Sequence, residues 1–109
     1  MSFEVLTIPE FDHRLKALAK RHASLKQDLQ ELSDSLSGTP YQGAALGMNC
    51  YKVRMRIASK GKGKSGGARV ITCVYAVDRT VWLLTIFDKS EQATISDKEL
   101  KALVAAIPK

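Results

Sequence analysis

A basic segment from Cys50 to Val77 constrains the fold more than any other part of this chain. After Cys50 it reads YKVRMRI, in which apolar and basic residues alternate. Because successive side chains of a strand point to opposite sides, this run predicts a strand with one apolar face and one face that carries Lys52, Arg54 and Arg56. The stretch from Ser59 to Gly67 follows, which we call the glycine loop, and it predicts a flexible connection whose backbone a phosphate can approach closely.

The net positive charge of the protein lies in this segment. Residues 50–77 hold seven Lys and Arg and no Asp or Glu, whereas residues 1–49 hold five against six and residues 78–109 hold five against five. An unpaired block of one sign repels itself, so its expected partner is a polyanion such as RNA, DNA or an acidic protein segment. The alternative is that the strand face and the loop lysines are solvated surface, as many charge runs are.

The length of 109 residues predicts a single domain over residues 1–109, with one core. No apolar run reaches the roughly 18 residues that span a bilayer, and the N-terminal residues lack a signal pattern, so we expect a cytoplasmic protein with no membrane partner. Cys50 and Cys73 fall on expected strands and are predicted to be free buried thiols. His13 and His22 are interpreted as ordinary helix residues at no metal-ligand spacing, so neither a metal site nor a cofactor is predicted.

The remaining sequence predicts an α+β fold: a small, mostly antiparallel sheet with an N-terminal helical hairpin and a C-terminal helix. Polar residues at Thr7, Ser24 and Ser96, each followed three positions later by Glu or Gln, indicate capped helix starts. One long helix is the alternative to the hairpin. The expected elements are a strand at 3–8, helices at about 9–22 and 24–37, a connecting loop at 41–49, strands at about 50–58, 68–77 and 80–88, and a helix at about 96–107.

Two runs in this sequence resemble a known family. YKVRMRIASKGKGKSGGARVI and the later WLLTIFDKSE are similar to the RelE/ParE superfamily of bacterial type II toxins, in its HigB-like and RelE-like branch. PEFDHRLKALAKRHASLKQDLQEL and ISDKEL resemble the same group, so the resemblance covers nearly the whole chain. It implies a microbial RNase-like fold, cleavage of mRNA on the ribosome with rRNA contacts through the basic face, and neutralisation by a cognate antitoxin. Other superfamily members poison DNA gyrase, which leaves open a non-nucleolytic toxin that acts by binding.

The basic residues suit metal-independent RNA cleavage. This reaction needs a base for the 2′-hydroxyl, cations for the pentavalent phosphorane and an acid for the leaving 5′-oxygen. Arg54, Arg56 and Arg69 are candidates for holding the phosphate, because a guanidinium offers planar bidentate donors and keeps its charge. Lysine can transfer protons when its pKa falls, which nearby positive charges favour, and Lys52 and Lys64 are the candidates, with their order as base and acid left open.

The resemblance adds further candidate site residues. RelE-like toxins carry basic residues at the positions of Lys52, Arg54, Arg56 and Arg69, and Lys89 matches another basic residue at the edge of the site. Phe87 stands where relatives have a tyrosine, so it offers a ring for stacking on a base but no hydroxyl. Lys60 and Lys62 of the glycine loop are expected to bind RNA phosphates rather than to perform chemistry.

Overall fold

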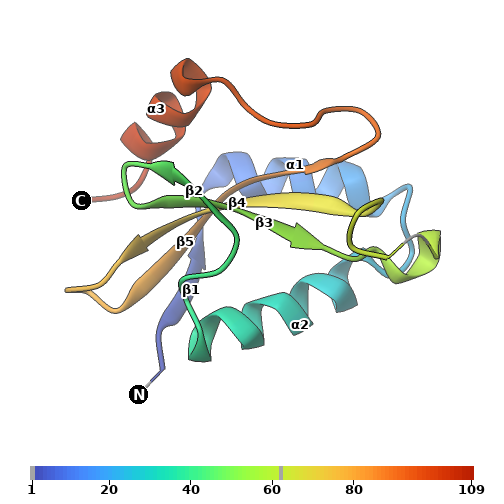
Figure 1. The fold of residues 1–109 in the computed structure, drawn as a ribbon, viewed down its shortest axis with the longest axis horizontal. Helices are drawn as coiled ribbons and strands as arrows, with labels where there is room; N and C mark the ends of the chain where they lie inside the picture. The colour runs from blue at the N-terminus through green and yellow to red at the C-terminus, as the bar shows by residue number, and fades with distance from the viewer. Residues whose placement is uncertain (1, 62) are drawn as a thin grey trace.

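A five-stranded sheet forms the centre of the protein, seen in a computed structural model that describes residues 2–61 and 63–109. The strands lie in the order β1-β5-β4-β3-β2; β1 is parallel to β5, and the other neighbouring pairs are antiparallel. Figure 1 shows α2 and α3 on opposite sides of the strands. The elements are β1 (Glu4–Thr7), α1 (Pro9–Ala19), α2 (Leu25–Gly38), β2 (Ala44–Gly47), β3 (Cys50–Met55), the 3-10 helix η1 (Ala58–Lys60), β4 (Ala68–Tyr75), β5 (Thr80–Asp88) and α3 (Asp97–Ala105).

The predicted α+β fold, with a helical hairpin and a C-terminal helix around a mostly antiparallel sheet, is confirmed. The run VWLLTIF is apolar on both faces, and it forms most of β5, which lies between β1 and β4. Val81, Leu83, Leu84 and Ile86 of this strand are buried in the core. Two-sided burial explains why this strand shows no alternation of polar and apolar residues.

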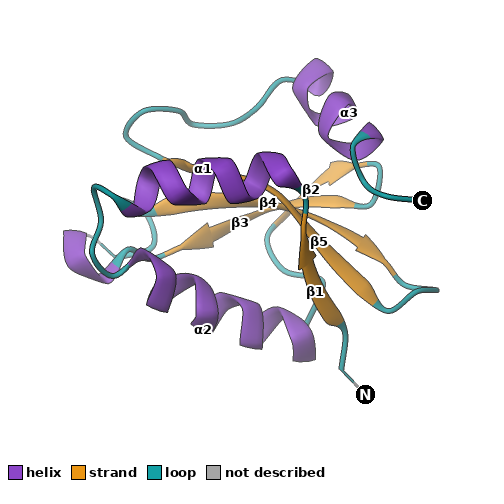
Figure 2. Ribbon diagram, turned by 180° about the vertical axis from the view of Figure 1, so that it is seen from behind, coloured by secondary structure: helices purple, strands orange, loops and turns teal. Residues whose placement is uncertain are grey.

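The two N-terminal helices form a hairpin, as Figure 2 shows from behind. Helix α1 packs against β5 through its buried residues Phe11 and Leu18, whereas α2 contacts β1, β3 and η1. Helix α1 ends at Ala19, so His22 lies in the connection between α1 and α2 rather than in a helix as predicted. No helix among the described residues combines the length and the apolar character needed to cross a bilayer.

Two local predictions differ from the structure. The segment 41–49, expected to be a loop, contains β2, which pairs with β3 through a turn in which Met48 and Asn49 both have positive φ. Positive φ at both central residues of a two-residue turn matches the right-handed twist of the two strands that it connects. Ser96 caps α3 as predicted by accepting a hydrogen bond from the Glu99 N–H at 3.1 Å. The other two predicted caps are wrong: α1 begins after Ile8 without a side-chain cap, and Ser24 precedes α2 but its hydroxyl donates to Asp28 instead of capping the helix.

Candidate functional site

The pairing of β3 with β4 brings the basic residues of the two strands together. Arg54 is opposite Arg69, and Lys52 is opposite Ile71, so these side chains share one face of the sheet. A cleft of about 760 Å³ opens on this face, and we call it the cationic cleft. It is lined by Gln42, Gly43, Ala44, Lys52, Val53, Arg54, Lys64, Arg69, Lys89 and Ala93.

Arg69 is the buried cation of the cleft, with only 4% of its surface exposed. Its guanidinium donates hydrogen bonds to the carbonyl oxygens of Lys64 at 3.0 Å, Ala68 at 3.1 Å and Ser65 at 3.3 Å. No carboxylate in residues 2–61 and 63–109 forms an ion pair with it. Burial and the neighbouring Arg54 lower the pKa of Arg69, yet a guanidinium stays charged in proteins. The cleft therefore contains a buried positive charge that an incoming anion would compensate.

The other cations of the cleft come from three further segments. Lys52 on β3 is half-buried, and its Nζ donates to the Ala93 carbonyl oxygen at 3.5 Å, across the cleft. Lys64 is exposed on the glycine loop, and Lys89 is exposed just after β5. The Lys89 N–H donates to the Gly67 carbonyl oxygen at 3.0 Å, which holds the start of the 89–95 segment beside the end of the glycine loop.

The remaining candidate residues lie outside the cleft. Arg56 is exposed beyond the end of β3 and does not line it. Phe87 is opposite Arg69 in the sheet, but its ring is buried and lines a separate hollow of about 340 Å³ beside α1 and α3. The Lys60 Nζ lies 2.9 Å from the Asp88 carboxylate, in a part-buried ion pair. Lys62 lies outside the described residues.

Asp88 is the residue that the sequence reasoning missed. It is 4% exposed, and its carboxylate accepts hydrogen bonds from the Lys60 Nζ at 2.9 Å and from the N–H and hydroxyl of Ser90 at 2.9 and 2.8 Å. The His22 Nε2 lies 3.1 Å from its second oxygen. Burial opposes ionisation, but the hydrogen bonds from Ser90 and Lys60 outweigh it and hold the pKa of Asp88 well below its usual range. One carboxylate thus connects the glycine loop, the α1–α2 connection and the segment that carries Lys89.

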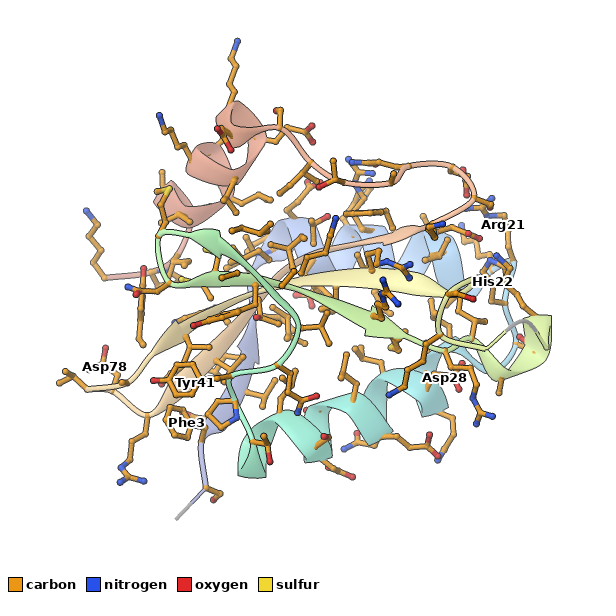
Figure 3. The ribbon with its side chains drawn as sticks, viewed as in Figure 1. Phe3, Arg21, His22, Asp28, Tyr41 and Asp78 are labelled. Atoms are coloured by element: carbon orange, nitrogen blue, oxygen red, sulfur yellow. The ribbon has the colours of Figure 1, made fainter. Side chains whose placement is uncertain are left out.

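A second buried carboxylate fixes the start of the glycine loop. Asp28 accepts hydrogen bonds from the Ser24 hydroxyl at 2.7 Å and from the Ala58 N–H at 3.0 Å. The Ser59 N–H in turn donates to the Ser24 hydroxyl oxygen at 2.8 Å. Figure 3 shows His22 and Asp28 at the same end of the molecule as η1. The two carboxylates both hold the start of the glycine loop, Asp28 through the Ala58 N–H and Asp88 through Lys60, so the chain enters the loop at a defined position.

Gly67 allows the glycine loop to enter β4, and Gly67→Ala is expected to destabilise the protein by roughly 2–3 kcal/mol. A Cβ at this position would lie 2.1 Å from the Met55 carbonyl oxygen and 3.0 Å from the Ile57 nitrogen, so β3 would have to move away. The measurement is the free energy of unfolding in urea. Gly38→Ala is the matched control, because a Cβ there meets no atom within 4 Å. Equal stability of the two variants would contradict this account of the strand entry.

Within the described ranges, no three His, Cys, Asp or Glu side chains are grouped closely enough to bind a metal ion. The charged groups that the cleft offers to a ligand are lysine and arginine side chains. Such a surface suits phosphate groups, because it combines one buried guanidinium with the exposed ammonium groups of Lys64 and Lys89.

Comparisons with known proteins agree with this architecture. The family described as the RelE toxin of the RelE/RelB toxin-antitoxin system matches residues 11–107. Among solved structures, the chain is similar to a double-arginine mutant of the E. coli toxin RelE in the free state, with 18% sequence identity and a TM-score of 0.64. That match covers 99% of this chain and 100% of the other. At this identity, the structural likeness shows a common fold.

Proposed function

The chain belongs to the RelE family of toxins from toxin-antitoxin systems, and from this premise we propose that it inhibits translation as a ribosome-dependent mRNA endonuclease. The observation that carries the proposal is the charge of Arg69, which is buried in the cationic cleft opposite Arg54 and has no ion pair with a carboxylate in the part of the chain that the structure describes. A buried cation without a carboxylate partner favours binding of an anion. For a toxin that acts on translation, the RNA phosphodiester is the anion of matching chemistry.

The proposed chemistry assigns the two arginines to the scissile phosphate. Arg54 and Arg69 hold its non-bridging oxygens and stabilise the extra negative charge that develops as the 2′-hydroxyl attacks phosphorus. The lysines that line the same cleft, Lys52, Lys64 and Lys89, position the RNA or transfer protons to and from the reacting oxygens. Arg56 lies outside the cleft on the continuation of β3, where it suits an adjacent phosphate. The role of Lys62 in RNA binding stays a prediction.

The composition of the cleft supports a requirement for the ribosome. Among the described residues that line it, Gln42 is the one polar side chain without a charge, and there is no imidazole or carboxylate. Such a cleft can bind and stabilise charge, but it offers no strong base at neutral pH. Holding reactants in a fixed orientation contributes effective molarities of about 10⁵–10⁸ M. We propose that the ribosome supplies this orientation by fixing the mRNA against the cleft.

Membership of the family implies a cognate antitoxin. The cations of the cleft would attract acidic side chains as well as RNA, since complementary charge steers both partners to the same surface. We propose that an acidic segment of the antitoxin covers Lys52, Arg54 and Lys64 and thereby competes with RNA.

A reconstituted translation reaction tests the proposed function. The purified protein is added to ribosomes translating a defined mRNA, and 5′ ends are mapped by primer extension, with a ribosome-free reaction as control. We expect new ends inside codons that depend on ribosomes, and full activity for Lys101→Ala, which removes an exposed cation of α3. If translation is blocked while the mRNA stays intact, the protein is a non-nucleolytic RNA binder rather than an endonuclease. Normal translation together with inhibited DNA supercoiling would favour the gyrase alternative.

A further inference from the structure

Cys50 and Cys73 face one another across β3 and β4, and both are free thiols. The Val74 N–H donates to the Asn49 carbonyl oxygen at 2.9 Å, which makes Asn49 and Val74 a hydrogen-bonded pair. The two kinds of pair alternate along an antiparallel ladder, so Cys50 and Cys73 form a non-hydrogen-bonded pair with Cα atoms about 4.5 Å apart. Disulfides have Cα separations of about 4.4–6.8 Å. The backbone therefore already has a spacing that a disulfide can bridge.

The two sulfur atoms also converge on one point. The Cys50 Sγ donates to the Met48 carbonyl oxygen at 3.4 Å, and the Cys73 Sγ lies 3.6 Å from the same oxygen. The neighbouring Cys73 and burial raise the pKa of the Cys50 thiol. Both sulfur atoms lie beside the same carbonyl oxygen, so whichever sulfur is oxidised first has the other placed to react with it.

We propose that Cys50 and Cys73 are an oxidation site, at which hydrogen peroxide converts the two thiols to a reversible intramolecular disulfide. One of the two sulfurs attacks a peroxide oxygen, the O–O bond breaks, and that sulfur becomes a sulfenic acid, while the other peroxide oxygen takes the thiol proton and leaves as water. The second sulfur then attacks the sulfur of the sulfenic acid, and the leaving hydroxide takes the proton of the second thiol to form another water. Two thiols and one peroxide thus give one disulfide and two waters.

Because both cysteines are buried, we expect a small oxidant to reach them more readily than a large one. Cys50 is 1% exposed and Cys73 is 0% exposed, so a bulky disulfide reagent reaches them only when the strands open. Hydrogen peroxide is close to water in size and requires a smaller opening. We therefore expect oxidation by peroxide to be faster than thiol exchange with oxidised glutathione at the same concentration.

The disulfide would tie together the two strands that carry the cationic cleft. The ring that it closes contains Lys52, Arg54, Lys64 and Arg69, so oxidation leaves the cleft in place and restricts the unfolded chain instead. The unfolding temperature of the oxidised protein is expected to rise by about 10 °C. We call this reversible cross-link between β3 and β4 a redox-controlled latch. Its formation does not depend on the proposed function.

Peptide mapping of the folded wild-type protein tests the proposal. The protein is treated with hydrogen peroxide, quenched with catalase, denatured, alkylated with N-ethylmaleimide and digested with trypsin. Cleavage after Lys26, Lys52, Arg69 and Arg79 places the cysteines on peptides 27–52 and 70–79. We expect these two peptides to be linked, to separate with dithiothreitol, and to be absent as a linked pair from Cys50→Ser and Cys73→Ser.

The readout is the linked peptide rather than the total mass, because Met48 is exposed and can also gain oxygen. Two alkylated cysteines after peroxide treatment would overturn the proposal. So would separate oxidation of each cysteine to sulfinic acid, or a disulfide between two molecules on a non-reducing gel. A linked peptide without an increase in unfolding temperature would overturn the latch.

Discussion

Arg69→Met is expected to reduce mRNA cleavage by a factor of about 10²–10³ while the protein remains at least as stable as the wild type. The loss of activity follows from the proposed contact between the guanidinium and the scissile phosphate. The unchanged or increased stability follows from the structure, since Arg69 is buried against carbonyl oxygens and forms no ion pair with a carboxylate of the described residues. A methionine replaces the aliphatic stem of the arginine and adds no charge to desolvate.

The measurement is the rate of cleavage by primer extension together with the free energy of unfolding in urea. Arg69→Lys is the informative companion, because it keeps a charge but loses the planar fork of donors. We expect Arg69→Lys to fall between the wild type and Arg69→Met in activity. Full cleavage activity of Arg69→Met would remove Arg69 from the site. A marked loss of its stability would show that the guanidinium is part of the fold rather than held for a ligand.

Asp88→Asn is expected to lower the free energy of unfolding at pH 7 by roughly 3 kcal/mol, because it removes the buried charge that pairs with Lys60. The same substitution should flatten the acid side of the stability profile. Hydrogen bonds from Ser90 and Lys60 place the pKa of folded Asp88 below the unfolded value of about 3.9. Its contribution is therefore complete above about pH 5 and is lost as the pH falls through 4 and below.

Urea unfolding of both proteins between pH 3 and pH 7 measures this effect. The difference in stability between the wild type and Asp88→Asn should be largest near pH 7 and should shrink toward pH 3. Asp78→Asn is the control, since Asp78 is exposed in the β4–β5 turn. Parallel pH profiles for the wild type and Asp88→Asn would mean that another group controls the acid unfolding of this protein.

The local part of the cleft could be predicted from the sequence, and the long-range part could not. The alternation in YKVRMRI places Lys52 and Arg54 on one face, and that face is the one that the cleft occupies. The alternation continues to Arg56, but β3 ends at Met55, so the third basic residue of the pattern leaves the cleft. The residues next to Arg69 in the sequence do not indicate that its side chain is buried. Its burial depends on the glycine loop, whose carbonyl groups accept hydrogen bonds from the guanidinium.

The ion pair between Lys60 and Asp88 could not be predicted from the sequence either. A lysine between glycines and serines has the local pattern of solvated surface, and its partner Asp88 lies 28 positions later in the chain. The sequence around Asp88 does not indicate a buried carboxylate either, since Asp88 ends an apolar strand and precedes a lysine. The β2 strand was missed because Ala44–Gly47 contains small residues of low strand preference and forms through its turn and its pairing with β3.

The parallel pairing of β1 with β5 has a consequence for the order in which the protein can be made. Glu4 pairs with Thr80, so the first strand has no partner strand until most of the chain has been synthesised. The cationic cleft also needs Lys89 and Ala93, which follow β5. Contacts so distant in sequence form late, because the intervening chain must first be closed into a loop. The complete cleft therefore cannot form before the segment that carries Lys89 and Ala93 has been synthesised and β5 has joined the sheet.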